Sequence, residues 1–362
     1  MVAKQNLCLY YENALALHLP ATYSSDLELI NIYLGKRNYY FLATITPFND
    51  GASSFLSKNK YLLNKTLAQA NFPVPHAIAM SKEEYSAYPL EELIAGLNFP
   101  LVVKPLNLGR GRGVLSNIKN LSTLSNYLNQ SFNEHPVLQI EEYHGGLKEY
   151  RVLIFRSKVI GVVERFAAKI VGNGQNSIAE LIDLANEERA RMNENEKFLA
   201  YNPMIVDEEY KNCLSDQGLD LDTVVPEGKT IQLCYTVNTG RGGDIFSHGK
   251  KIHPQNAKLL CQIAKKVGLN YVGLDVLCED INQSFTSTKW LILEANFNPD
   301  ITLHEVPPHG ESVNVTRKVL KYLIFRHPFS YFSHLCAKGK TAIYLKVILV
   351  IALVLLLSFL AS

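Results

Sequence analysis

This chain of 362 residues has few cysteines, a formal net charge close to zero and no internal repeats. The six cysteines are scattered and form no C-x-x-C pair, so neither a zinc site nor a disulfide framework is expected, and a reducing compartment is the default. The formal net charge of +2 gives no electrostatic reason to expect a nucleic-acid partner. A chain of this length can bury a sizeable core and is expected to form two or more lobes.

Several familiar catalytic motifs are also missing. No Gly-Lys-[Ser/Thr] follows a glycine-rich loop, no G-x-G-x-x-G fingerprint occurs, and the histidines form no H-E-x-x-H pair. No order of Ser, His and Asp suggests a nucleophile elbow. The N-terminus does not lead into the compact apolar segment of a secretory signal. The expected chemistry therefore needs a different set of residues.

One long apolar run stands near the C-terminus. Val347 to Leu360 is interrupted only by Ser358, and extension back to Thr341 brings the run to about the 20 residues that a bilayer requires. Three lysines stand at its N-terminal flank: Lys338, Lys340 and Lys346. By the positive-inside rule we expect a transmembrane tail anchor over residues 341–362, with the catalytic domain in the cytoplasm. A buried or amphipathic helix is the alternative, but the run shows no polar stripe.

Two late apolar segments carry polar side chains where apolar ones belong. Tyr271–Cys278 contains Asp275, and Trp290–Asn296 contains Glu294 and ends in Asn296. Side chains alternate along a strand, so Glu294 and Asn296 share a face. A buried unpaired carboxylate is costly, and a divalent cation shared by the three oxygen donors would remove that cost. Such ligands suit Mg²⁺ (or Mn²⁺), which usually arrives with a nucleotide phosphate. The alternative is a set of polar residues on a solvated sheet surface.

A lysine and a glycine-rich loop form a candidate anion site. Lys104 ends an apolar strand and could reach a phosphate, although it could equally be a strand-end lysine that extends to solvent. Gly109, Gly111 and Gly113 follow at every second position, which permits N–H groups to point at an anion. Glycines of this kind also make ordinary turns.

Acidic residues stand just beyond the next strand. Glu141, Glu142 and Glu149 could accept hydrogen bonds from ribose hydroxyls, or could form a solvated acidic turn. Lys65 lies in a helical pattern over residues 60–70. Elsewhere a helix is predicted over Pro254 to Val267, and helices alternate with strands and hairpins. The sequence therefore predicts an α+β (mixed α/β) fold.

Taken in order, these residues resemble the ATP-grasp superfamily, and within it the ATP-grasp portion of cyanophycin synthetase and of bifunctional glutathione synthetases. Those families show K-P-L-x-G-x-x-G-R-G-V, and here stands Lys104-Pro-Leu-Asn-Leu-Gly-Arg-Gly-Arg-Gly-Val114. They show D-Y-R, G-V-D and E-x-N-x-x-P, which appear here as Glu149-Tyr-Arg151, Gly273-Leu-Asp275 and Glu294-Ala-Asn-Phe-Asn-Pro299. The likeness covers roughly residues 53 to 325.

The resemblance implies a fold with ATP held between two lobes of antiparallel sheet. It also implies transfer of the γ-phosphate to a carboxylate, followed by attack of an amine on the acyl phosphate. The implied phosphate contacts are Lys65 and Lys104, and the resemblance places Glu142 and Glu149 near adenine and ribose. Gly109, Gly111, Gly113 and Glu141 are the further candidate nucleotide contacts from the residues themselves. The implied metal ligands are Asp275, Glu294 and Asn296. Arg151 and Arg241 are our own candidates for the catalytic residues, as clamps for anionic groups.

The chain departs from the families at a few places, so the identity of its substrates is not implied. Arg241 stands where the families show a small residue, Asn173 replaces an acid, and Asp300 replaces the usual glycine after the E-x-N-x-x-P motif. We expect a ligase for small-molecule amino acid or peptide substrates, attached to a membrane by its C-terminal helix. A homo-oligomer or a partner enzyme is also possible. The rivals are a phosphotransferase and a non-catalytic nucleotide-binding module that recruits partners to a membrane.

The expected domain organisation has four parts: a short N-terminal region (1–55), an ATP-grasp domain (56–325), a linker (326–340) and the tail anchor (341–362).

Overall fold

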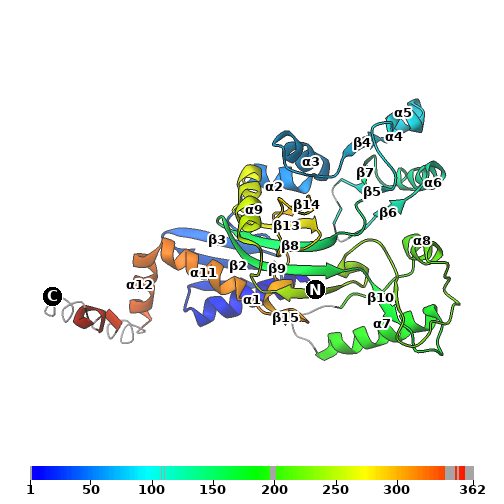
Figure 1. Ribbon diagram of the computed structural model, residues 1–362. Coiled ribbons are helices and arrows are strands. Elements are labelled where there is room, and N and C mark those ends of the chain that lie inside the picture. Colours follow the sequence, from blue (N-terminus) through cyan, green and yellow to red (C-terminus); the bar gives the residue numbers. More distant parts are fainter. Residues whose placement is uncertain are drawn as a thin grey trace. The chain divides into compact units, whose positions relative to one another are not determined.

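Two sheets built mainly from antiparallel strands dominate the first of the chain's two structural units (Figure 1). The computed structural model describes residues 2–106, 108–109, 111–195, 201–338, 347–348 and 350–354. The first unit comprises Met1–Gln5 and Phe48–Val313, and the second comprises Asn6–Pro47 and Asn314–Ser362.

The smaller sheet of the first unit has four strands in the order β4-β7-β5-β6, and every neighbouring pair is antiparallel. Leu138 and Ile140 of β7 face an apolar core, so the alternate residues Gln139 and Glu141 face the opposite side. The strands are β4 (Ala77–Ser81), β5 (Leu101–Pro105), β6 (Leu115–Ile118) and β7 (Val137–Glu142). The accompanying helices are α4 (Lys82–Ala87), α5 (Leu90–Leu93) and α6 (Leu121–Ser131).

The larger sheet has six strands in the order β14-β13-β8-β9-β12-β15, antiparallel except for the edge pair β12 and β15. The strands are β8 (Lys148–Phe155), β9 (Lys158–Phe166), β12 (Asp244–His248), β13 (Tyr271–Cys278), β14 (Trp290–Asn296) and β15 (Gly310–Glu311). On β8, Tyr150 and Val152 are buried in the main apolar core. Strand alternation therefore puts Glu149 and Arg151 on the other face. The Arg156–Ser157 turn that joins β8 to β9 has positive φ at both residues, which matches the twist of a tight hairpin.

Three helices supply apolar side chains to the core under the larger sheet: α2 (Gly51–Lys58), α3 (Lys60–Gln69) and α9 (Pro254–Val267). Helix α9 has the predicted bounds. Pro254 occupies its first turn, and Gly268 ends it with a φ of 82°, in the left-handed region that glycine adopts readily. Two short helical segments, η1 (Thr239–Arg241) and α10 (Thr302–Glu305), complete this part.

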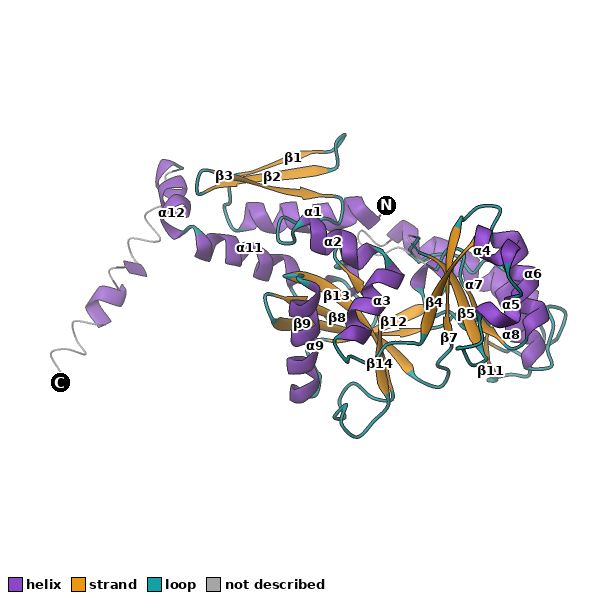
Figure 2. Ribbon diagram, turned by 90° about the horizontal axis from the view of Figure 1, so that it is seen from above, coloured by secondary structure: helices purple, strands orange, loops and turns teal. Residues whose placement is uncertain are grey.

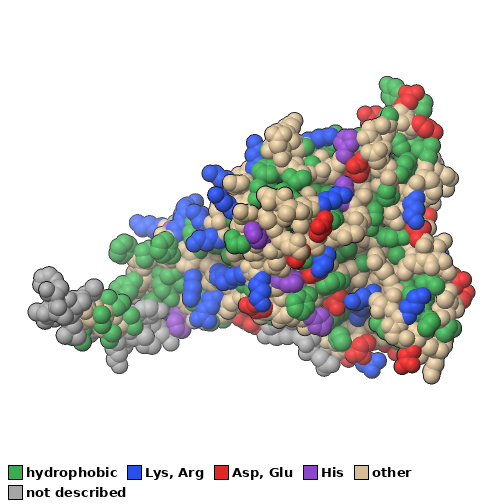
Figure 3. Space-filling model, in the orientation of Figure 1, with side chains coloured by type: hydrophobic (Ala, Val, Ile, Leu, Met, Phe, Trp, Pro, Cys, Tyr) green, Lys and Arg blue, Asp and Glu red, His purple; other side chains and the backbone are tan. Residues whose placement is uncertain are grey.

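A small subdomain of the first unit has an apolar core of its own. Its elements are β10 (Lys169–Val171), α7 (Ile178–Asn195), α8 (Glu208–Asp216) and β11 (Thr230–Gln232). Tyr210 and Leu214 of α8 pack there against Ile178 and Ile182 of α7. Figure 3 shows both acidic and basic side chains on the surface of this region. On α7, Ile178, Leu181 and Ile182 are buried while acids such as Glu180 and Glu187 are exposed, so the helix has an apolar face and a charged face.

The second unit contains an antiparallel three-stranded sheet in the order β1-β2-β3 (Figure 2). Its strands and helices are β1 (Ala21–Ser24), β2 (Leu29–Leu34), β3 (Arg37–Leu42), α11 (Val315–Arg326), α12 (Pro328–Ala337) and most of α1 (Val2–Ala16). Segments far apart in the sequence meet in this unit. The backbone N–H of Gly35 donates to Ser330 Oγ at 2.9 Å, and the Tyr331 hydroxyl donates to the Leu17 carbonyl at 2.6 Å.

The mixed α+β ATP-grasp fold that the resemblance implies fits this architecture, but the predicted transmembrane helix is wrong. Among the residues that the structure describes, no helix has both the length and the apolar character needed to cross a bilayer. The predicted single-pass, tail-anchored localisation is corrected on the same finding. Most of the segment 341–362 lies outside the described residues, and only 347–348 and 350–354 of it are described. The predicted domain boundaries stay predictions.

Candidate functional site

A cleft in the first unit is lined by strands of both sheets and by the glycine-rich connection between β5 and β6. Eight of the residues predicted from the sequence line it: Lys104, Gly109, Gly111, Glu141, Glu142, Glu149, Asp275 and Glu294. Further lining residues that the sequence did not single out include Lys60, Ser116, Tyr143, Arg165, Tyr235 and Thr236.

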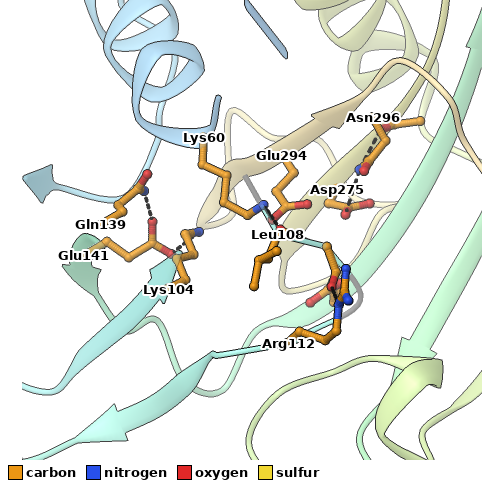
Figure 4. Close-up of polar contacts among 12 residues, drawn as sticks. Lys60, Lys104, Leu108, Arg112, Gln139, Glu141, Asp275, Glu294 and Asn296 are labelled. Atoms are coloured by element: carbon orange, nitrogen blue, oxygen red, sulfur yellow. Dashed lines mark hydrogen bonds and ion pairs between the residues drawn. The ribbon is translucent and has the colours of Figure 1, made fainter. Parts of the chain in front are cut away.

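Lys104 and Glu141 form a buried ion pair on the side of the small sheet that faces the cleft. Lys104 Nζ lies 2.7 Å from Glu141 Oε1, and Gln139 Nε2 donates to Glu141 Oε2 at 2.6 Å (Figure 4). The register pairs Lys104 with Gln139 and Val102 with Glu141, which puts these side chains on one face. Burial opposes the lysine's charge, but the carboxylates of Glu141 and Glu294 hold the pKa of Lys104 above its usual value.

The lysine that reaches the cleft from α3 is Lys60, at the start of the helix. Its Nζ donates to the Leu108 carbonyl at 2.6 Å and lies 3.4 Å from Glu294 Oε1 (Figure 4). It therefore links the glycine-rich connection to β14. Lys65 points elsewhere: its Nζ donates to the Ala77 carbonyl at 3.0 Å, and its side chain does not line the cleft.

Asp275 lies at the centre of a charged network on the large sheet. Arg151 donates from both Nε and NH2, the latter at 2.9 Å, and Arg165 NH1 lies 3.3 Å from Asp275 Oδ2. Asn296 Nδ2 donates to the same Oδ2 at 3.2 Å. Burial alone would raise the pKa of Asp275, but Arg151 and then Arg165 bring it below its usual value. Asp275 is therefore held as a carboxylate.

Glu149 is the second acid of this network and behaves in the opposite way. Arg165 NH1 donates to Glu149 Oε1 at 2.7 Å. Burial raises the pKa of Glu149 to about 7, since the attraction of Arg165 is partly offset by repulsion from Asp275 and Glu294. One face of the sheet thus holds a firmly ionised acid and an acid that titrates near neutral pH.

Glu142, next to Glu141 on β7, is held by the backbone N–H of Asn98 at 3.0 Å and by its side-chain amide at 2.8 Å. Burial would raise the pKa of Glu142, but these hydrogen bonds lower it. Successive strand residues point to opposite faces, so the two neighbouring acids have different partners.

The glycine-rich connection needs glycine for two reasons. Gly111 and Gly113 have positive φ, at 69° and 63°. A Cβ on Gly113 would come within 2.9 Å of Pro105 Cγ, so this glycine packs against the strand and does not line the cleft. Arg110 lies outside the described residues.

Arg241 lies beside the cleft, and two carboxylates hold it. Its NH2 lies 2.7 Å from Asp207 Oδ2 and 3.1 Å from Glu209 Oε2. Glu209 is buried, and its Oε1 accepts from the backbone N–H groups of Tyr235 and Thr236 at 3.1 and 2.6 Å. The first turn of α8 therefore fixes the segment 235–241, part of which lines the cleft.

The donor set at β13 and β14 fits a magnesium ion by its chemistry. Asp275 and Glu294 are directly paired across the two strands, and Asn296 pairs with Gly273 two residues along. Carboxylate and amide oxygens are the ligands that Mg²⁺ takes. Within the described part of the chain no group of three or more His, Cys, Asp and Glu side chains could hold a metal ion, so this set depends on the Asn296 amide.

Lys60 and Arg165 are the main residues that the sequence did not single out. Lys60 follows Asn59, which caps α3 through a hydrogen bond to the Leu62 N–H. A basic residue in the first turn of a helix is unfavourable for the helix dipole, so Lys60 stands out in the sequence as a usable signal. Arg165 pairs with Glu149 in the β8–β9 hairpin, but the register shifts by one residue between Leu153 and Ile154. Counting back from the Arg156–Ser157 turn without this shift would have paired Glu149 with Glu164.

Comparison with known proteins agrees with the resemblance seen in the motifs. No protein-family model matches the chain. The cyanophycin synthetase of Geminocystis herdmanii is 29% identical over 315 residues, which is 86% of this chain and 35% of that protein. The glutathione biosynthesis bifunctional protein GshAB of Pasteurella multocida is 28% identical over 286 residues, 77% of this chain and 37% of that protein. The chain thus spans about a third of the length of these curated relatives.

A solved structure supports the fold. The crystal structure of a bifunctional glutathione synthetase from Pasteurella multocida matches 89% of this chain and 43% of that chain, with a TM-score of 0.58 and 23% identity. The predicted resemblance to cyanophycin synthetase and to bifunctional glutathione synthetases is therefore confirmed.

Proposed function

We propose that this chain is an ATP- and Mg²⁺-dependent ligase that joins a carboxylate to an amine through an acyl phosphate. The observation that carries the proposal is the lining of one cleft by the basic side chains of Lys60, Lys104 and Arg165 and by the paired acids Asp275 and Glu294. Phosphoryl transfer needs positioned charges more than it needs a covalent nucleophile, and this lining supplies them.

The chain's own residues would divide the work as follows. Lys60 and Lys104, which both line the cleft, would bind the phosphates as point charges. Asp275, Glu294 and Asn296 would hold the magnesium, whose charge offsets the charge that develops on the transferred phosphate. Arg151 orients Asp275 by a bidentate contact. Glu142 and Glu149 are proposed to meet the base and ribose.

Arg151 and Arg241 remain proposals as clamps for the acyl phosphate or for a substrate carboxylate. Each is held by carboxylates in the structure, Arg151 by Asp275 and Arg241 by Asp207 and Glu209. An anion that binds either arginine would share it with these acids. We therefore expect each arginine to stabilise a bound anion through the position of its charge, while the guanidinium stays paired with these carboxylates.

The relatives support a substrate of the amino acid or peptide class. Cyanophycin synthetase and the glutathione biosynthesis protein are named for products that are built from amino acids. The chain matches about a third of each, so the particular acid and amine are not carried over.

The ligase proposal is tested by ADP release over a panel of amino acids and short peptides, with and without a second amine. We expect ADP release to need Mg²⁺ and a carboxylate, and we expect hydroxylamine to trap the acyl phosphate as a hydroxamate. Glu294→Gln should lower the rate at least about a hundredfold, because it removes a metal ligand from the transition state. The matched variant Glu187→Gln, on the exposed side of α7, should not change it.

Two outcomes would go against the proposal. A stable phosphorylated product that forms without an amine would indicate a phosphotransferase. Absence of carboxylate-stimulated turnover across the panel, with ATP bound, would indicate a nucleotide-binding module.

A further inference from the structure

Both oxygens of Glu141, like those of Asp275, are already engaged by protein donors. One accepts from Lys104 Nζ at 2.7 Å and the other from Gln139 Nε2 at 2.6 Å. Lys104 and Glu141 are only 6% and 4% exposed, and Gln139 only 1%, although Lys104 and Glu141 both line the cleft. Its carboxylate is thus held on the small sheet by Lys104 and Gln139, next to the lysine that is proposed to bind phosphate.

The ion pair with Glu141 opposes the binding of phosphate that is proposed for Lys104. A lysine recruits phosphate through its charge, but a lysine 2.7 Å from a buried carboxylate forms a pair with no net charge. Gln139 keeps Glu141 from turning away, so the pair persists until something competes for the lysine. The competing group must be an anion that can reach Lys104 from the cleft.

We propose that Glu141 is a positioning residue, the counter-ion that holds Lys104 in place and that a nucleotide phosphate must displace from the lysine. The proposal deepens the proposed function and rests on it, because it takes the ligand of the cleft to be a phosphate-bearing nucleotide. It assigns Glu141 to the phosphate end of the site, and not to the base and ribose that the resemblance implies for the neighbouring acids.

If Glu141 has this role, its effect on nucleotide affinity must depend on the number of phosphates in the ligand. Glu141→Gln removes the charge and keeps the shape. Gln139 Oε1 has no hydrogen-bond partner among the described residues, so the Gln139 amide can turn over and accept from the new amide. The variant should therefore keep its fold while Lys104 loses its competitor.

The experiment compares the dissociation constants of MgATP, MgADP and adenosine for the full chain by titration calorimetry. We expect Glu141→Gln to bind MgATP and MgADP about fivefold more tightly, and adenosine within about twofold of the parent. The KM for ATP should fall, and kcat should fall with it because ADP leaves more slowly. In a Lys104→Gln background the tightening should disappear, since the two residues act as one pair.

The matched comparison is Glu142→Gln, one residue along β7. Its acid is held by Asn98 and not by a lysine, so it should shift all three ligands by a similar factor. If Glu141→Gln does not fold, Glu141→Asp moves the carboxylate one methylene away from Lys104 and should give the same phosphate-dependent tightening at a smaller size.

Two results would overturn the inference. Equal weakening of all three ligands by Glu141→Gln would make Glu141 a contact of the base or ribose, and no change in any of them would leave it without a role in binding. Failure of the parent chain to bind MgATP at all would instead count against the proposed function, so the two failures can be told apart.

Discussion

Single buried acids set the electrostatic character of the cleft. Asp275 and Glu149 lie on the same face of the large sheet and share Arg165, yet their pKa values move in opposite directions. Asp275 has two arginines and an amide to stabilise its charge, whereas Glu149 has one arginine and two nearby acids. The number of cationic partners within reach therefore decides which buried carboxyl group stays ionised.

The raised pKa of Glu149 predicts how stability depends on pH. Its folded pKa of about 7 lies above the ordinary 4.5, so the stabilisation of the protonated form is complete below about pH 4.5 and is lost as pH rises through about 7. The free energy of unfolding falls by on the order of 3 kcal/mol over this pH range. Urea unfolding from about pH 5 to 8 should show the parent losing more stability than Glu149→Gln. The exposed control Glu187→Gln should keep the parent's slope, and identical slopes for parent and Glu149→Gln would refute the assignment.

At the level of elements, the first turn of α8 supports one wall of the cleft. Glu209 and Asp207 bind Arg241, Glu209 also accepts from two backbone N–H groups of the 235–238 segment, and the Tyr210 hydroxyl donates to the Arg241 carbonyl at 2.5 Å. Burial raises the pKa of Glu209, and the charge of Arg241 works against this rise. The segment thus depends on α8 for its conformation.

Replacement of Arg241 tests this support. Arg241→Ala leaves Glu209 buried without its guanidinium, and should cost about 3 kcal/mol of unfolding free energy and at least about tenfold in kcat/KM. Arg241→Lys keeps the charge and should lose less of both. A loss of activity below tenfold would count against a role for Arg241 in the reaction, and unchanged stability would count against the support by α8.

Local sequence patterns predicted the helices and strands that have strong periodicity. They failed where contacts between distant segments of the chain determine which residues meet. An acid within an apolar run is conspicuous, so the sequence predicted the two strands that carry Asp275 and Glu294, and the structure pairs these residues across them. Helix α8 was missed because only Tyr210, Cys213 and Leu214 make its short apolar stripe. Which lysine of α3 faces the cleft depends on how the helix packs on the sheet. The pairing of Arg151 with Asp275 depends on the register of β8 and β13, which no local pattern encodes.

At the scale of the whole molecule, the first unit assembles a cleft that is more acidic than basic. Among the residues that the structure describes, three basic and five acidic side chains line it, so acids remain in excess there even when Glu149 is protonated. A triphosphate alone would be repelled by this surface, whereas a triphosphate with bound Mg²⁺ brings the missing positive charge to Asp275 and Glu294. The account therefore predicts that nucleotide and metal bind together.

The measurement that tests this claim most directly is calorimetric titration of the full chain with ATP in Mg²⁺ and again in EDTA. We predict tight binding only with Mg²⁺, weaker by at least about tenfold in EDTA, and loss of this difference in Glu294→Gln. Equal affinity for ATP with and without Mg²⁺, or no binding in either, would contradict the account.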